Sequence, residues 1–114
     1  MPGVRYEDLY AAAASETAEV ALKGRLDSAV VGVTCPKGEK RRVTGIMGRT
    51  ANLGYLVARL AGQTILTFAL EILNAGVDFA LLDVDVPEGL TLAFYEKSTS
   101  GTAVCELTVR YETE

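Results

Sequence analysis

Histidine is absent from this sequence of 114 residues. Histidine is the commonest general base in enzymes and the commonest zinc ligand in proteins. Its absence excludes a Ser-His-Asp or Cys-His catalytic site made by this chain alone. We therefore predict no catalytic residue, no metal ligand and no cofactor, and expect a protein that is not an enzyme.

Cysteine is scarce, with Cys35 and Cys105 as the two examples. Small secreted domains held by disulfides are usually denser in cysteine, so we expect two small buried hydrophobic side chains. No uninterrupted apolar run reaches the roughly 18–20 residues that span a bilayer. The first five residues also lack the pattern of a secretory signal peptide. These absences predict a cytoplasmic protein with no membrane partner.

Length and composition are those of one globular unit. Apolar residues make up 49% of the chain and charged residues 23%, close to the averages for globular domains. A chain of this length corresponds to one ordinary domain. We predict a single domain over residues 1–114.

The first half of the predicted fold is a helix followed by a hairpin. Residues 6–23 are rich in alanine, glutamate and leucine, which favour a helix, and Gly24 could end it. Two runs at residues 29–35 and 41–47 flank a short polar loop with glycine. Two strands joined in this way are typical of a β-hairpin.

The second half is predicted to be a helix and three strands. Thr50 or Asn52 can cap a helix over residues 53–73, and Gly76 can follow its end. Strands are predicted over residues 79–86, 90–95 and 102–111, the last with strict alternation of apolar and polar residues. The predicted fold class is α/β (α+β), in the order helix-strand-strand-helix-strand-strand-strand. Its five-stranded sheet is antiparallel, with the helices on one face.

The helix predicted over residues 53–73 has apolar residues around nearly the whole circumference of its last two turns. A surface helix normally has a charged back, and a large exposed apolar patch is uncommon on a monomer. The first helix could cover this face, but we favour a second copy in a two-fold homodimer. The predicted dimer interface consists of Leu66, Leu70, Leu73, Phe79 and Leu81.

The segments that carry a family resemblance are the β-branched run at residues 28–33, the aliphatic-rich segment 53–73 and the three C-terminal strands. Over roughly residues 5–112, this pattern resembles the Roadblock/LC7 domain family of dynein light chains and regulators of small Ras-like GTPases. The resemblance implies a homodimer formed by the second helix and the third strand. It also implies a scaffold or regulatory role toward a small GTPase, without a nucleotide held by the domain itself.

Basic residues are concentrated between residues 23 and 49, although the net charge of the chain is −4. A basic hairpin could contact an acidic protein surface or an anion, and the free N–H groups of a helix beginning near residue 50 could assist. The simpler interpretation is a solvated loop. An acidic chain argues against nucleic acid as the partner. The candidate contact residues are Lys37, Lys40, Arg41, Arg42, Arg49 and Thr50.

The sequence leaves three hypotheses open. We favour a dimeric protein-interaction or scaffold module. The alternative is a small oligomeric regulatory protein that binds an anion or another ligand. The third is an enzyme that uses carboxylates, since Asp83 and Asp85 point the same way on one predicted strand. Carboxylates that face water on a half-exposed strand are the more common explanation of that pair.

Overall fold

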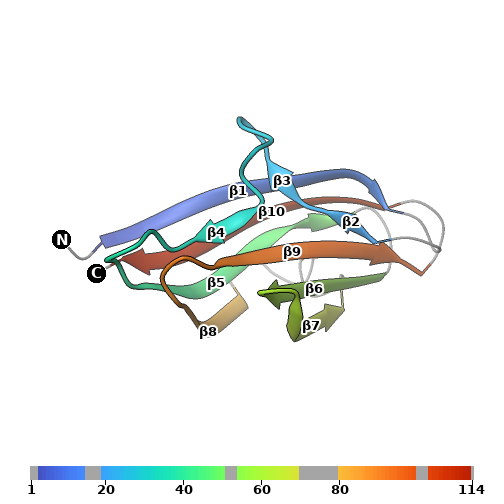
Figure 1. Ribbon diagram of the computed structural model, residues 1–114. Coiled ribbons are helices and arrows are strands. Elements are labelled where there is room, and N and C mark those ends of the chain that lie inside the picture. Colours follow the sequence, from blue (N-terminus) through green and yellow to red (C-terminus); the bar gives the residue numbers. More distant parts are fainter. Residues whose placement is uncertain (1–2, 15–18, 51–53, 70–79, 100–102, 114) are drawn as a thin grey trace.

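The computed structural model describes residues 3–14, 19–50, 54–69, 80–99 and 103–113, which form two antiparallel β-sheets packed face to face (Figure 1). No helix occurs in these ranges, so none there could cross a membrane. The strands are β1 (Gly3–Ala14), β2 (Val20–Ala21), β3 (Lys23–Gly24), β4 (Gly32–Thr34), β5 (Arg41–Thr50), β6 (Gly54–Leu60), β7 (Gln63–Ala69), β8 (Ala80–Val86), β9 (Thr91–Ser98) and β10 (Ala103–Thr113). The predicted α/β fold class is therefore wrong.

The first sheet has the strand order β3-β1-β10-β5-β8, and the second has the order β2-β9-β6-β7, with β4 also paired to β9. Strands β1 and β10 run side by side along the length of the molecule (Figure 1), from the pair Gly3–Thr113 to the pair Ala14–Ala103. Residues of β1 contact β2, β4 and β9 of the other sheet. This stacking places β7 and β8 on the same side of the sandwich, each as the last strand of its sheet.

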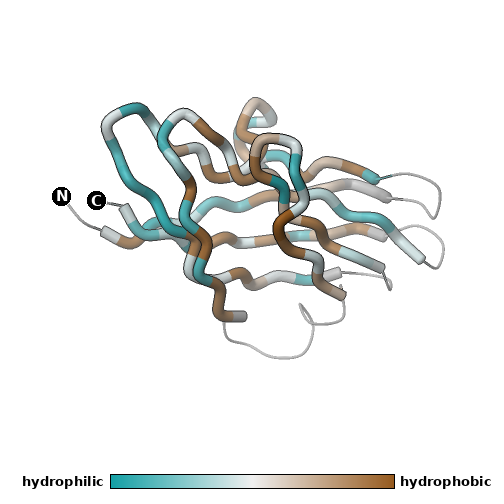
Figure 2. Tube along the Cα trace, turned by 60° about the horizontal axis from the view of Figure 1, so that its bottom comes forward, coloured by the Kyte–Doolittle hydropathy of each residue, from teal (hydrophilic) through white to brown (hydrophobic). Residues whose placement is uncertain are grey.

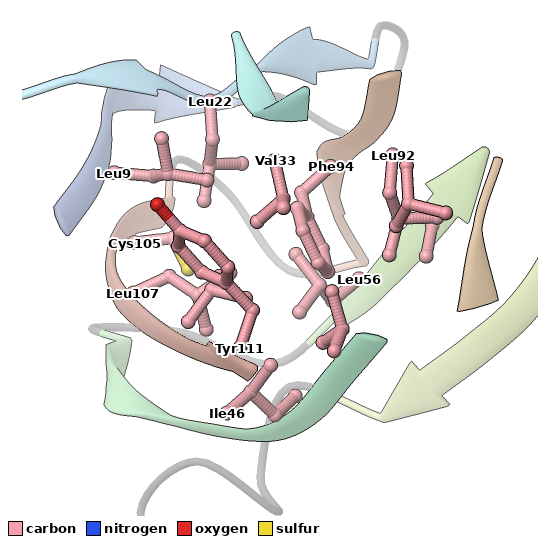
Figure 3. Packing of buried hydrophobic residues seen from close by; sticks show 14 of the residues in the cluster. Leu9, Leu22, Val33, Ile46, Leu56, Leu92, Phe94, Cys105, Leu107 and Tyr111 are labelled. Carbon is pink, nitrogen blue, oxygen red and sulfur yellow. The ribbon is translucent and has the colours of Figure 1, made fainter. Parts of the chain in front are cut away.

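The core lies between the two sheets and is built by alternation. Hydrophobic and hydrophilic residues alternate along the strands (Figure 2). Phe94 of β9 and Leu107 of β10 are both buried, and Figure 3 shows side chains from the two sheets meeting in one cluster. Burial of one large apolar side chain contributes roughly 1.5–3 kcal/mol to stability. The alternation predicted for the last strand is confirmed, because Cys105, Val109 and Tyr111 are buried as well.

The helix predicted over residues 6–23 is wrong, because most of its described residues belong to strands. Leu9 and Ala11 are buried on the inner face of β1, whereas Tyr6 and Asp8 are exposed. This period of two is typical of a half-buried strand. Pairing with the full length of β10 overrides the helical preference of the alanine-rich segment. Residues 15–18 lie outside the described residues.

The helix predicted over residues 53–73 is also wrong where the structure describes it. Strands β6 and β7 form a hairpin, and its two-residue turn consists of Ala61 and Gly62, with φ angles of 52° and 80°. Positive φ at both central residues is the signature of the tight turn that best fits the twist of a hairpin. Gly62, which is unfavourable inside a helix, was the sequence signal for this turn.

The predicted single sheet is replaced by two because the chain crosses between the layers. Strand β4 pairs with β9, and β5 pairs with β8 and β10, so the predicted hairpin between residues 29–35 and 41–47 does not form. The crossings at residues 36–40 and 87–90 lie beside each other, joined by hydrogen bonds from Cys35 N to Leu90 O and from Gly89 N to Cys35 O. The three C-terminal strands exist, but they alternate between the sheets instead of forming a meander.

The resemblance to the Roadblock/LC7 family depended on two helices at fixed places in the element order. Neither helix is found in the described parts of those segments, which are strands instead. The structure therefore gives no support to the GTPase-regulating role that the resemblance implied.

Candidate interaction surface

Strand β7 is the outermost strand of the second sheet. It pairs with β6 on one side, and no described strand pairs with its other side. In an antiparallel sheet, every second residue of an edge strand directs its N–H and C=O away from the sheet. The edge of β7 that no described strand pairs is therefore a row of hydrogen-bonding groups that can pair with another strand.

The side chains of β7 are uncharged, and the strand has no proline or glycine, as its sequence Gln-Thr-Ile-Leu-Thr-Phe-Ala shows. Unpaired edge strands are usually protected by charged residues, proline, a bulge or a covering segment. Ile65 is 39% exposed, and Leu66 and Phe68 pack against the core but are only partly buried. The register shift between Ala58 and Arg59 skips Ile65, so β7 itself carries a bulge at this residue.

Other long edges of the sandwich are better protected. On β8, Asp83 and Asp85 have side chains that are 81% and 84% exposed. The short strand β3 pairs with β1 at Leu9 and Tyr10, and the rest of β1 includes charged residues such as Arg5. Strand β7 is thus the long edge without charge in the described part of the chain.

The side of the sandwich that β7 shares with β8 is partly open to water. On β8, Leu82 and Val84 reach the core but are only partly buried, and Leu81 is 81% exposed on the outer face. We call the apolar side chains along these two edges the open side. It consists of Ile65, Leu66, Phe68, Leu81, Leu82 and Val84.

Two of the five residues predicted for the dimer interface lie on the open side. Leu66 is on β7 and Leu81 is on β8. They belong to different sheets, so they do not form the continuous helical stripe that was predicted. Leu70, Leu73 and Phe79 lie outside the described residues.

The basic residues predicted to contact a partner or an anion do not converge. Lys37 and Lys40 are exposed in the crossing between β4 and β5. Arg41 points inward, donates a hydrogen bond of 2.6 Å to the Thr34 carbonyl oxygen, and lies over the Tyr111 ring.

Arg42 and Arg49 are far apart on β5. The Nε atom of Arg42 is 3.6 Å from Asp83 and 3.4 Å from Asp85, so these two carboxylates face water beside an arginine. Arg49 lies seven residues further along the strand, which corresponds to about 23 Å. The expected cluster of positive charge is therefore divided into separate places.

A groove of about 410 Å³ lies at the end of the sandwich where the two crossings meet. Its charged lining residues are Lys40, Arg41 and Arg42 together with Glu39, Asp85, Glu88 and Glu112. The carboxylates balance the basic groups, so the groove offers no excess of positive charge to hold an anion.

Thr50 does not begin a helix. It is the last residue of β5 and pairs with Cys105 of β10. The helix N-terminus that was expected to help bind an anion therefore does not start at this residue. Residues 51–53, which follow it, lie outside the described residues.

The structure reveals one unusual ionisable residue that the sequence did not lead us to predict. Glu96 of β9 is fully buried, and burial raises the pKa of its carboxyl to about 7. The alternation along β9 was the sequence signal for this burial, because Leu92, Phe94 and Glu96 are spaced by two residues and share the inner face. Among the described residues, no group of His, Cys, Asp and Glu side chains could hold a metal ion.

Both cysteines are buried and free, as predicted. Burial is the main cause that raises the pKa of the Cys105 thiol to about 12. A thiol with so high a pKa is almost entirely neutral at pH 7 and is a weak nucleophile.

Comparison with known proteins adds no functional assignment. No protein-family model matches this chain, and no curated protein or solved structure matches it.

Proposed function

We propose that this chain is a non-catalytic protein-interaction module that forms a homodimer by pairing β7 with β7 of a second copy. The observation that carries the proposal is the uncharged edge of β7, with which no described strand pairs. An uncharged edge of this kind can act as a template for another strand. In the dimer, the second sheet of one copy would continue into the second sheet of the other.

A second copy is the occupant that fits the chemistry of this edge best. Antiparallel pairing about a two-fold axis places the same seven residues opposite one another. In β7 these are threonine, glutamine, alanine and large apolar residues, so no like charges meet and no charge loses water. Elsewhere the two copies would repel weakly, because each has a net charge of −4.

Pairing would also cover part of the open side. Ile65 is partly exposed at the edge, and Leu66 and Phe68 leave part of their surface in water. A neighbouring strand would remove apolar area from water at these three residues, which is favourable by roughly 25 cal/mol for each Å². Strand pairing and apolar burial therefore favour the same contact.

Molar mass by size-exclusion chromatography with light scattering tests the proposal. The wild-type chain, with a mass of 12.1 kDa, is expected to elute with twice that mass at micromolar concentration. Thr67→Lys places a charge on the edge in each copy and is expected to give a monomer. The matched control is Thr99→Lys, at an exposed residue just after β9, which should leave the dimer intact. A monomeric wild type, or a dimer that resists Thr67→Lys, would contradict the proposal.

A further inference from the structure

Glu96 lies in the interior of the sandwich, near the middle of the second sheet. Its neighbours in the sheet are Val20 of β2 and Leu56 of β6. Side chains directly opposite each other in paired strands share a face. The carboxyl therefore points inward with Leu56, which is fully buried.

The Glu96 carboxyl has no partner among the residues that the structure describes. The residue has no exposed surface, and neither of its carboxylate oxygens accepts a hydrogen bond from a described residue. An ionised carboxylate without a partner is expensive to bury, so the folded protein accommodates the neutral acid. The ion-paired carboxylates of Glu19, Asp83, Asp85 and Glu106 all retain contact with water.

The described groups that face Glu96 provide no positive charge. Across the interior, β10 turns two ionisable groups inward: the Cys105 thiol, which pairs in the sheet with Ala11 of β1, and the Tyr111 phenol further along the strand. Along β9 the inward neighbours are Phe94 and Ser98.

The nearby charged residues lie on the outer faces of the two sheets. Glu19 and Arg59 form an ion pair over the outer face of the second sheet, and Lys97 projects to that side of β9. Glu106 of β10 pairs with Arg25 on the outer face of the first sheet. None of these groups can stabilise an anion inside the core by direct contact.

We infer that Glu96 is a pH-sensitive switch of the sandwich, which holds the sheets together as a neutral acid and separates them around β9 when it ionises. The direction follows from linkage. The pKa of Glu96 is raised in the folded protein from an ordinary value of 4.5 to about 7, so the unfolded chain loses its proton first. Stability contributed by the neutral acid is present at low pH and falls between roughly pH 4.5 and 7. Above that window the loss is complete, at roughly 10²-fold in the unfolding equilibrium.

Urea unfolding of the full chain between pH 5 and pH 8 tests the switch. Relative to Glu96→Gln, the wild type is expected to become roughly 10²-fold less stable across this range. The matched control is Glu112→Gln, which neutralises an exposed carboxyl of β10 and should keep the pH dependence of the wild type. Equal pH dependence in the wild type and in Glu96→Gln would overturn the inference.

A direct titration keeps the test informative if Glu96→Gln fails to fold. In the wild type, the ¹³C NMR signal of the Glu96 carboxyl is expected to titrate with a midpoint near 7. A midpoint near 4 would overturn the inference, since the carboxyl would then be stabilised as an anion.

A separate measurement locates the place where the two sheets are expected to separate. Cys105 is buried beside Glu96, so its alkylation by N-ethylmaleimide, followed by mass spectrometry, reports separation of the sheets there. At pH 8 the wild type is expected to react faster at Cys105 than Glu96→Gln does. Equal rates in the two proteins at the same pH would show that ionisation does not open this part of the core.

Discussion

Arg59 and Glu19 form a bidentate ion pair across the outer face of the second sheet. The guanidinium of Arg59 on β6 donates hydrogen bonds of 2.6 and 2.9 Å to the two carboxylate oxygens of Glu19. On the way it lies over the Tyr95 ring of β9, 4.8 Å from the ring centroid. Glu19, which directly precedes β2, is thereby connected to β6 and β9. The ion pair lies on the outer face of this sheet, whereas Glu96 points to the inner face.

The first prediction concerns the acid sensitivity of this ion pair. The hydrogen bond from Arg59 holds the pKa of the Glu19 carboxyl below its usual value; partial desolvation opposes this shift, and the charges of Arg59 and Lys97 support it. Stability from a carboxyl with a lowered pKa is present above its unfolded value and is lost as the pH falls through its folded value. The melting temperature of Arg59→Met should therefore be a few degrees lower than that of the wild type at pH 7, and the difference should be smaller at pH 3.

A control isolates the ion pair from the change in net charge. Arg5→Met removes an exposed arginine of β1 and should shift the melting temperature by a similar small amount at both pH values. If Arg59→Met is equally destabilised at pH 7 and pH 3, the pair does not contribute through the charge of Glu19.

The second prediction concerns the turn between β6 and β7. Ala61 and Gly62 both have positive φ, which glycine and asparagine adopt more readily than alanine does. Ala61→Asn should raise the free energy of unfolding by about 0.5–1 kcal/mol, and Gly62→Ala should lower it by about 1 kcal/mol. Urea unfolding measures both changes. A stabilising Gly62→Ala would contradict the hairpin and favour a helix through this segment.

The third prediction concerns two places where backbones approach each other closely. A Cβ atom at Gly48 would lie 1.9 Å from the Glu106 carbonyl oxygen, and one at Gly32 would lie 2.0 Å from the Leu92 carbonyl oxygen. Both carbonyl oxygens belong to the backbone of a paired strand and cannot easily move away. Gly48→Ala and Gly32→Ala should therefore each lower the free energy of unfolding by about 2–4 kcal/mol.

A third glycine serves as the control for this prediction. Gly3→Ala would place its Cβ 3.8 Å from Thr113, an ordinary contact. Its free energy of unfolding should therefore stay within about 0.5 kcal/mol of the wild type. Comparable stability of Gly48→Ala and Gly3→Ala would mean that β5 and β10 are not paired in this register.

The sequence predicted strands best where one face is buried and the other is wet. On β10, the apolar residues Cys105, Leu107 and Val109 alternate with polar ones, and their burial follows that period. On β6, Leu56, Val57 and Ala58 are buried in succession. A strand that is apolar on both faces cannot be distinguished from a buried helix by periodicity alone, and this ambiguity produced the error over residues 53–73.

The division into two sheets could not be predicted from loop length. Residues 36–40 form a short polar connection of the kind that usually joins paired strands, yet they carry the chain from one sheet to the other. Strand β4 pairs with β9, and β5 pairs with β8 and β10, so the partners of both strands lie far away in the sequence. Such distant pairing depends on the packing of the whole core, which a local pattern does not contain.

The candidate site was predicted only in part. Leu66 and Leu81 were selected for their hydrophobicity and do lie along the open side. Strand β7 is important because it has no charged side chain along an edge of its sheet. A sequence does not show which strand lies at the edge. Glu96 was missed because the predicted strand stopped at Tyr95, one residue before the inward phase placed a carboxyl in the core.

Amide hydrogen exchange along β7 is the most direct test of the central claim that this edge binds a second copy. It would be measured above and below the protein concentration at which the mass falls from dimer to monomer. We predict that the outward-facing amides of residues 63–69 exchange more slowly at the higher concentration, while those of β8 are unchanged. Exchange in β7 that does not depend on concentration, or protection that appears on β8 instead, would contradict the claim.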